Sequence, residues 1–191
     1  MSDQRIQRTR ARIRDALVTL LCEKPYQEVQ VREIIGRAEV GRATFYSHFR
    51  DKEDLLVTLF LNMLDEMETH PSARAESIVP YAGLLLRHFS EARALCRSLQ
   101  RSGKLDVLLR AGEARLRRSI EQRLEDTALG SPSLRAAFAA GAFFNLFRWW
   151  LAQGMHPPWQ RMEEAYQQLV CYGLQGVAPL GGHTDVTSAR T

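Results

Sequence analysis

The chain has 191 residues, which is enough for one domain or two small ones, and 45% hydrophobic and 25% charged residues are typical of a soluble globular protein. No window reaches the ~18 uninterrupted apolar residues of a membrane-spanning helix, and the polar start MSDQRIQRTR has no apolar signal core, so we expect no membrane association. Cys22, Cys96 and Cys171 lie far apart and form neither a metal-binding pair nor a disulfide framework, which favours a reducing cytoplasm.

The excess of positive charge is confined to the N-terminal segment. Residues 1–52 contain 11 Lys and Arg against 7 Asp and Glu, whereas the rest of the chain contains 15 of each. The whole net charge of +4 therefore belongs to the first 52 residues. A patch of this kind attracts nucleic-acid phosphates, although a basic face that only improves solubility would have the same composition.

Hydrophobic periodicity predicts helices along almost the whole chain. Before the break at His70-Pro71-Ser72, we expect helices over Arg5–Cys22, Val31–Ala38, Arg42–Phe49 and Lys52 to about Glu68. The last of these begins after Asp51, which is a good N-cap. Beyond the break, helices are expected over about Glu76–Phe89, Glu91–Gln100, Leu105–Leu129, Pro132–Gln153 and Pro158–Leu174. The prediction is an all-α fold of about nine helices.

Residues 29–52, VQVREIIGRAEVGRATFYSHFRDK, indicate two short helices joined by a tight turn. This is the pattern of a helix-turn-helix, whose second helix enters the major groove of DNA. With Phe45 and Phe49 pointing inward, the outward side chains are those of Arg42, Ala43, Thr44, Tyr46, Ser47 and His48. Arginine can form two hydrogen bonds with guanine, a threonine methyl can contact thymine, and hydroxyl groups reach phosphates. An ordinary amphipathic surface helix is the alternative.

Lys52 is the second element of this hypothesis. It lies at the start of a long helix, where its charge opposes the helix dipole. A phosphate bound there would remove this penalty, because helix N-termini favour anions. The alternative is an ordinary solvated lysine.

The motif resembles the DNA-binding motif of the TetR family. TetR-like proteins commonly carry Ala-Gly-Val, a short variable pair, Thr-Phe-Tyr, two residues and Phe, followed by Lys-Glu-x-Leu. This chain has Ala38-Glu39-Val40, Gly41-Arg42-Ala43, Thr44-Phe45-Tyr46, Phe49 and Lys52-Glu53-Asp54-Leu55, and the likeness covers roughly residues 10–56. The resemblance implies that DNA is faced by Gln30, Arg32, Arg42, Ala43, Thr44, Tyr46, Ser47, His48 and Lys52.

Two positions depart from the family pattern. Glu39 replaces the usual glycine of the turn, and a non-glycine residue at positive φ costs roughly 1 kcal/mol. Its carboxylate would also repel phosphates if it pointed toward the duplex. Gln30 replaces the more usual threonine before the first short helix and is a poor N-cap.

The segment Ala136–Leu151 has only two polar residues, Asn145 and Arg148, and a helix that is apolar all round must be covered all round. We expect one side to pack on the core and the other on a second subunit, with close approach at small residues such as Gly141 and Ala142. A helix buried wholly inside one subunit is the alternative. Along the last helix, a second apolar side predicts that the last two helices form a homodimer interface, as they do in TetR-like proteins. This side comprises Met162, Ala165, Tyr166, Leu169, Val170 and Gly173.

The resemblance further implies a pocket for a small effector among the C-terminal helices. The surrounding residues favour a mostly apolar ligand, although each of them is more often a core residue than a ligand contact. The candidate ligand-binding residues are Asn62, Met63, Glu66, Tyr81, Leu85, His88, Leu109, Phe143 and Phe147.

The combined expectation is a DNA-binding domain over residues 1–52, an effector-binding and dimerisation domain over 53–178, and a disordered tail over 179–191. The function expected is a repressor that leaves a pseudo-palindromic operator in double-stranded DNA when a small molecule binds. We find no catalytic motif, no metal-ligand spacing and no cofactor signature, which argues against an enzyme. The remaining alternative is a helical small-molecule carrier or interaction protein without sequence-specific DNA binding.

Overall fold

The computed structural model of the chain describes residues 2–73, 77–125 and 130–175. Within these ranges the chain forms nine α-helices, one short 3-10 helix (η1) and no β-strand, which confirms the all-α prediction. The elements are α1 (Ser2–Glu23), η1 (Tyr26–Glu28), α2 (Val31–Ala38), α3 (Arg42–His48), α4 (Lys52–Glu68), α5 (Ala82–Glu91), α6 (Arg93–Arg101), α7 (Lys104–Glu121), α8 (Pro132–Ala152) and α9 (Trp159–Gln175). The expected tail over 179–191 lies outside the described residues.

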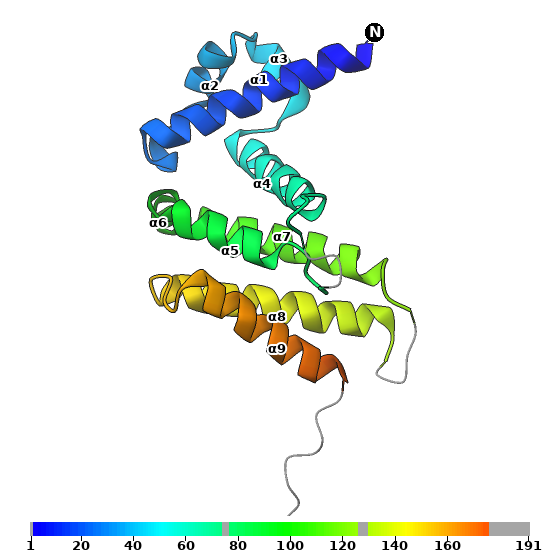
Figure 1. Cartoon of the computed structure of the whole chain (residues 1–191). Helices are drawn as coiled ribbons and strands as arrows, with labels where there is room; N and C mark the ends of the chain where they lie inside the picture. Colours follow the sequence, from blue (N-terminus) through cyan, green and yellow to red (C-terminus); the bar gives the residue numbers. More distant parts are fainter. Residues whose placement is uncertain (1, 74–76, 126–129, 176–191) are drawn as a thin grey trace, which may run out of the picture.

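The helices are stacked along one elongated molecule (Figure 1). The first three lie at one end, α4 leads away from them, α5 to α7 form the next layer, and α8 with α9 lies at the far end. Helix α4 packs on α7, α7 on α8, and α5 on α9. Every layer is thus connected to its neighbour by direct helix packing.

Aromatic rings fill the centre of the larger helical part. Phe89 lies edge-on to Phe147 with ring centroids 4.8 Å apart, and Phe143 lies edge-on to Tyr166 at 5.1 Å. Gly112 allows α7 to approach its neighbours closely, because a Cβ atom there would lie 2.8 Å from a ring atom of Phe144. Such close packing makes this core sensitive to changes of even one methylene group.

Side-chain caps fix several helix boundaries where the sequence predicts them. The Asp51 carboxylate accepts hydrogen bonds from the backbone N–H groups of Glu53 and Asp54, both at 2.8 Å. Ser131 caps α8, with Pro132 at the first helical position. After α8, Gly154 adopts a positive φ of 67°, in the left-handed conformation that favours glycine.

Two predicted helices are shorter in the structure. Helix α5 begins at Ala82 rather than near Glu76, because Pro80 lacks a backbone N–H and disfavours helical geometry in the residue before it. Helix α7 ends at Glu121, whereas the sequence predicts a helix that continues to about Leu129. Residues 126–129 of that predicted helix lie outside the described ranges. The Arg123 guanidinium donates to the carbonyl oxygens of Ser119 and Ile78, and so supplies a partner for a carbonyl of the last helical turn.

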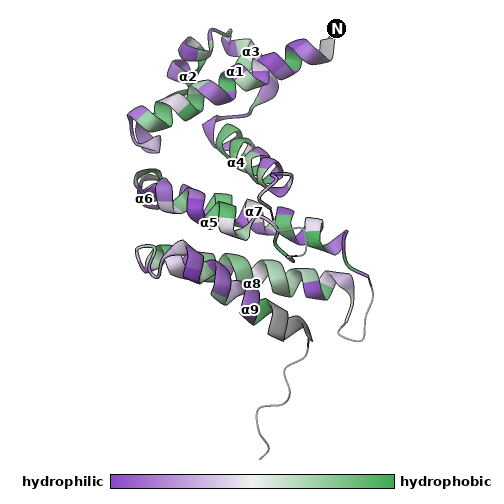
Figure 2. Cartoon of the chain, in the orientation of Figure 1, coloured by the Kyte–Doolittle hydropathy of each residue, from purple (hydrophilic) through white to green (hydrophobic). Residues whose placement is uncertain are grey.

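One side of α8 is buried and the other is not. Its inward residues include Phe143, Phe144, Phe147 and Trp150, whereas Leu134, Phe138 and Trp149 are 62%, 48% and 49% exposed. Figure 2 shows that α8 is hydrophobic along most of its length. On α9, three of the residues expected at a subunit interface, Met162, Tyr166 and Val170, are instead buried within the protomer, and Leu169 is 60% exposed.

The first helices are attached to the rest of the molecule through η1 and α4. The buried Ser98 hydroxyl of α6 accepts a hydrogen bond of 3.0 Å from the backbone N–H of Tyr26 in η1. Lys104, at the start of α7, pairs with Glu53 in the first turn of α4. Across the described residues, no helix is both long and apolar enough to span a membrane.

Candidate nucleic-acid interface

Apolar residues from three helices hold the helix-turn-helix together. Ile13 and Leu17 of α1, Ile34 of α2 and Phe45 of α3 are fully buried, and Phe49 closes the underside of α3. The rings of Phe45 and Phe49 lie 6.0 Å apart. With these residues turned inward, α3 must present its other face to solvent.

Glu39 forms the turn between α2 and α3 in the left-handed conformation, with φ 49° and ψ 47°. Its N–H donates to the carbonyl of Gly36, and the N–H of Val40 donates to that of Ile35. These two bonds define a Schellman motif, in which the residue after the helix adopts positive φ. The expectation of positive φ at this position is therefore confirmed.

The Glu39 side chain does not extend freely into solvent. The Arg12 guanidinium of α1 donates to its carboxylate at 3.0 Å and to its carbonyl oxygen at 3.3 Å. The carboxylate is thereby paired with a cation. The Glu39 side chain nevertheless remains 83% exposed, so the pair is open to screening by salt.

The outward face of α3 has the composition that the sequence predicts. Arg42, Ala43, Tyr46 and Ser47 are exposed, while Thr44 and His48 are half-buried. The Arg42 guanidinium lies 5.7 Å from the centre of the Tyr46 ring, and the Ser47 hydroxyl donates to the Thr44 carbonyl at 2.8 Å. No acidic residue occurs on α3, so the face offers hydrogen-bond donors without a repelling carboxylate.

Gln30 and Arg32, at the start of α2, are also exposed. The backbone N–H of Gln30 donates to the Glu33 carboxylate at 2.9 Å, which satisfies one N–H at the helix start. A hydrogen bond from Lys24, followed by that backbone bond, lowers the pKa of Glu33. The cap thus comes from Glu33, and not from the side chain at the position usually occupied by threonine.

Lys52, which the sequence predicts to face DNA, contacts backbone carbonyls of its own chain. Its ammonium group donates to the carbonyl oxygens of Val29 at 2.7 Å and Tyr26 at 3.1 Å, with Gln27 at 3.5 Å. It also lies 4.5 Å from the centre of the Tyr26 ring. Burial, and then the charge of Lys104, lowers the pKa of Lys52. In this structure the ammonium group therefore holds η1 and Val29 to the start of α4 through these hydrogen bonds.

Sequence reasoning did not single out Arg10, which lies beside the end of the recognition helix. Its guanidinium is 5.9 Å from the centre of the Phe49 ring. The signal that was available is the density of arginines in α1, at positions 5, 8, 10, 12 and 14. These arginines contribute to the excess of positive charge in residues 1–52, but the charge alone does not indicate which of them lies near α3.

The nine candidate ligand-binding residues differ in their burial. Tyr81, Leu85, Leu109, Phe143 and Phe147 are buried in the hydrophobic core. Asn62 and Met63 are half-buried, and Glu66 and His88 are exposed. A ligand at the buried residues would have to displace packed side chains. None of the nine lines a cavity that lies beside α6 among the described residues.

The described residues contain no group of three or more His, Cys, Asp or Glu side chains that could hold a metal ion. The outward side chains of α3 form a polar face that includes Arg42 instead. Two short helices at a tight turn, a buried underside and an outer face of α3 without acidic residues define a helix-turn-helix DNA-binding protein.

The comparisons identify the family. Residues 13–59 match the family described as "Bacterial regulatory proteins, tetR family", and the comparisons support assignment of the chain to the TetR family. It is similar to the "Fatty acid metabolism regulator protein" of Bacillus subtilis (strain 168), with 32% identity over 80 residues. The match covers 40% of this chain and 41% of that protein, so the chain spans about two fifths of the length of this curated relative.

Solved structures share the fold over most of the chain. The "Dihydroxyacetone kinase operon activator DhaS" superposes with a TM-score of 0.59 at 20% identity, covering 87% of this chain and 96% of that one. RolR, whose structure is described as a complex with the ligand resorcinol, superposes with a TM-score of 0.53 at 24% identity, covering 87% and 89%. These similarities establish the fold of the C-terminal helices as well as that of the motif.

Proposed function

We propose that the protein is a ligand-responsive transcriptional regulator, a repressor whose homodimer binds a pseudo-palindromic operator in double-stranded DNA. The observation that carries this proposal is the exposed, acid-free face of α3, with Arg42, Tyr46 and Ser47 on a rigid helix-turn-helix. An arginine on such a face can read guanine, and its neighbours can fix the register on the phosphates. The other contacts we propose are Gln30, Arg32, Ala43, Thr44 and His48.

The proposed dimer interface is the outer side of the last two helices. Leu134, Phe138 and Trp149 of α8 and Leu169 of α9 are large apolar side chains that the protomer leaves exposed. Large exposed apolar side chains on neighbouring helices support a protein–protein contact. A two-fold axis between such helices would place two copies of α3 about 34 Å or somewhat more apart, one turn of DNA.

The proposed effector is a small, mostly apolar molecule of the cytoplasm that binds among the C-terminal helices and lowers the affinity for DNA. RolR, a protein of the same fold, is described as binding resorcinol, which supports a small-molecule effector for this fold. Helix α4 supports the coupling, because it runs from the packed C-terminal helices to the helix-turn-helix. Movement of α4 would change the spacing of the two recognition helices, as allosteric coupling requires.

Selection of bound fragments from random DNA, followed by sequencing, tests the DNA-binding part. We expect an enriched inverted repeat. On that sequence, Arg42→Ala should lose about 1–3 kcal/mol of binding free energy and relax the base preference at one position in each half-site. Arg118→Ala, on the exposed side of α7, is the matched control and should bind like the wild type. Absence of any enriched sequence would contradict the proposal and favour the helical carrier.

A further inference from the structure

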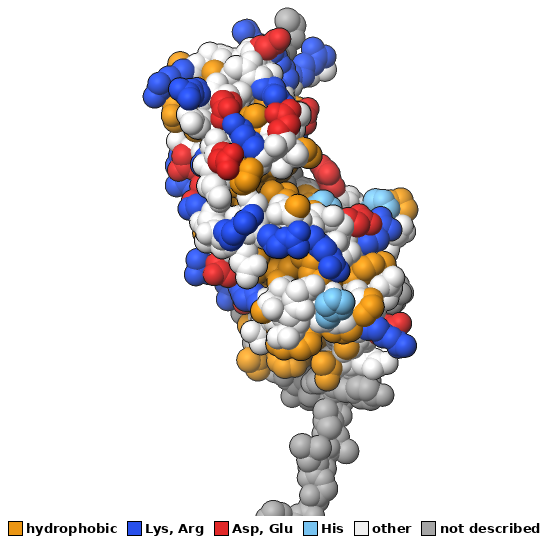
Figure 3. Space-filling model, turned by 90° about the vertical axis from the view of Figure 1, so that its left-hand side faces the viewer, with side chains coloured by type: hydrophobic (Ala, Val, Ile, Leu, Met, Phe, Trp, Pro, Cys, Tyr) orange, Lys and Arg blue, Asp and Glu red, His pale blue; other side chains and the backbone are white. Residues whose placement is uncertain are grey.

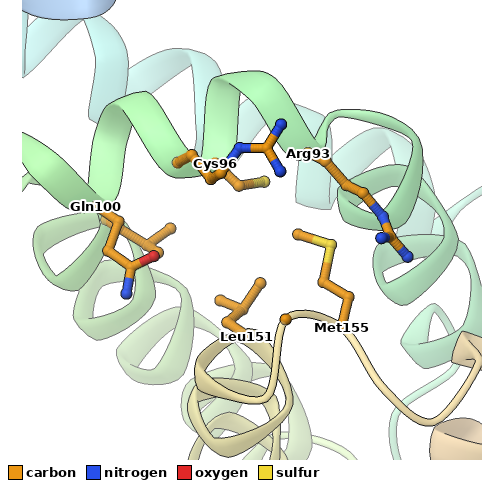
Figure 4. Close-up of a pocket in the computed structure, with 8 residues that line it drawn as sticks. Arg93, Cys96, Gln100, Leu151 and Met155 are labelled. Carbon is orange, nitrogen blue, oxygen red and sulfur yellow. The ribbon is translucent and has the colours of Figure 1, made fainter.

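A cavity of about 70 Å³ opens between α6, the end of α8 and the turn that follows α8 (Figure 4). Its walls come from segments that are far apart in the sequence. Figure 4 shows Cys96 of α6 facing Leu151 and Met155, with Gln100 and Arg93 at the two sides. The candidate effector residues discussed above do not contribute to it, so it is a separate site.

The rim of the cavity is basic. Arg93, Arg97 and Gln100 belong to α6, a helix that contains three arginines and no acidic residue. Arg97 has no hydrogen-bond or ion-pair partner among the described residues, and Arg93 donates only its Nε hydrogen, to the Ser90 carbonyl at 3.3 Å. Figure 3 shows basic side chains gathered across the middle of this side of the molecule, at the level of α6. Unused guanidinium donors of this kind are suited to a carboxylate, which they bind with two parallel hydrogen bonds.

The floor of the cavity is apolar. Cys96 and Met155 are buried, and Leu151 is half-buried beside them. The Cys96 thiol contacts the Phe89 carbonyl oxygen at 3.7 Å. Burial raises the pKa of this thiol to about 11, so it stays protonated near neutral pH and adds a soft, neutral surface rather than a second charge. A purely inorganic anion would leave this floor without a partner.

We propose that this cavity binds a small organic monocarboxylate, with the carboxylate on Arg97 at the basic rim and a short alkyl tail over Cys96, Leu151 and Met155. The size of the cavity limits the length of the tail. One water needs about 10–15 Å³ of such volume, so 70 Å³ holds roughly five non-hydrogen atoms, as many as propionate has. The volume is well below the ~300 Å³ at which drug-sized pockets begin, which excludes a large effector from this site.

The position of the cavity connects it with DNA binding, and this step rests on the proposed function. Ser98 lies between Arg97 and Gln100 on α6 and accepts the hydrogen bond from the Tyr26 backbone in η1. The Tyr26 carbonyl in turn accepts from Lys52, at the start of α4. A ligand that tightens the cavity therefore acts on the helix that holds η1, and propionate should change the affinity for DNA as well as bind.

Calorimetric titration of the full chain with sodium propionate tests the site without DNA. We expect one propionate per protomer and binding at least about tenfold weaker for propionamide, which has the same size but no charge. Arg97→Gln should weaken propionate binding by a similar factor. The matched control is Arg101→Gln, which removes a charge from the same helix outside the cavity lining.

Several outcomes would overturn the inference. If propionamide binds as tightly as propionate, the carboxylate is not recognised. If inorganic phosphate binds as tightly as propionate, the alkyl tail is not recognised. Equal losses for Arg97→Gln and Arg101→Gln would indicate a diffuse basic surface rather than this cavity. The regulator proposal can fail independently of this inference. If the protein binds propionate but selects no DNA sequence, the carboxylate site stands and only its link to DNA binding is lost.

Discussion

At the scale of single residues, Glu39 combines an unfavourable backbone conformation with a favourable contact. Its positive φ costs roughly 1 kcal/mol relative to glycine. Against this, the ion pair with Arg12 has side chains 51% and 83% exposed, and such pairs contribute about 0–1 kcal/mol. The sequence predicts the strain from the family pattern, but the pairing with a residue 27 positions earlier depends on how α1 packs.

Replacing Glu39 by glycine should slightly raise thermal stability and tighten DNA binding. Relief of the strain exceeds the loss of an exposed ion pair, and we expect Tm to rise by at most about 3 °C. Removal of a negative charge near the phosphates should strengthen DNA binding, more so at low salt. Thermal melts and DNA titrations at two salt concentrations measure both effects.

Glu39→Gln separates the two causes, because it removes the charge and the ion pair while leaving a side chain at positive φ. We expect tighter DNA binding without a rise in Tm for this variant. A lower Tm for Glu39→Gly than for the wild type would mean that the contact with Arg12 outweighs the strain.

Lys52→Met should lower the free energy of unfolding. The ammonium donates hydrogen bonds to backbone carbonyls of Val29 and Tyr26, and bonds to charged groups contribute about 1.5–3 kcal/mol when well shielded. Since Lys52 is partly exposed, we expect a loss of about 1–2 kcal/mol, measured by urea titration. Arg32→Met is the control, since this exposed side chain should affect DNA binding but not stability. If Lys52→Met is as stable as the wild type, the Lys52 ammonium does not hold η1 to the start of α4.

At the scale of secondary structure, local signals predict most helix boundaries. Asp51, Ser131 and Gly154 act at the positions where the sequence places them, because capping depends on neighbouring backbone groups. Apolar periodicity places the start of α5 too early, because the pattern continues through Pro80, which the helix excludes. The boundary within α7 involves the Arg123 contact with Ile78, 45 residues away, which no local pattern contains.

Acid should loosen the contact between α4 and α7 that Glu68 makes. Burial alone would raise the pKa of Glu68, but hydrogen bonds from Ser119 and Arg115 outweigh it and hold the pKa below the ordinary 4.5. A carboxyl group with a lowered pKa in the folded state stabilises the fold above its unfolded pKa and loses this effect as pH falls through the folded value. The difference in Tm between wild type and Glu68→Gln should therefore be present at neutral pH and shrink below pH 4.5.

The matched control for this pH dependence is Glu66→Gln, two residues away on the exposed side of α4. This variant should follow the wild type at each pH. A Tm difference between wild type and Glu68→Gln that stays constant across the acid range would show that the carboxyl charge does not hold the two helices together.

At the scale of the whole molecule, the sequence predicts the exposed face of α3 better than it predicts the cavity beside α6. The face lies on two adjacent short helices, so its residues share a surface as soon as the motif folds. The cavity is assembled from distant segments, and Cys96 meets Leu151 and Met155 only through the packing of α6 against the end of α8. The sequence also does not show which apolar residues of α8 remain exposed. Phe138 is 48% exposed and Phe143 only 2%, because they lie on different sides of the same helix.

The dimer should dissociate when charge is placed on the outer side of α8. Phe138→Arg introduces a cation at the centre of the proposed interface, and we expect the mass measured by light scattering to change from dimer to monomer. Gly141 is a less decisive position than the sequence indicates, because a Cβ there would lie 3.9 Å from the Glu113 carboxylate, which could pair with an introduced arginine.

Val18→Arg provides the control for this measurement. Val18 is 42% exposed on α1, so the variant adds the same charge at a similar exposure away from α8. It should remain dimeric. A monomeric wild type at micromolar concentration, or a dimeric Phe138→Arg variant, would place the subunit contact elsewhere.

The inward-turned ammonium of Lys52 also has a consequence for the ions around DNA. Each phosphate that a cation neutralises releases condensed counterions, and the slope of log K against log salt changes by about 0.9 for each one. A lysine that is bound to protein carbonyls releases none. The salt dependence of a dimer should therefore be shallower by about 2 than a count of the cations near α3 suggests. Potassium titrations of wild type and Lys52→Met on one operator should then run parallel.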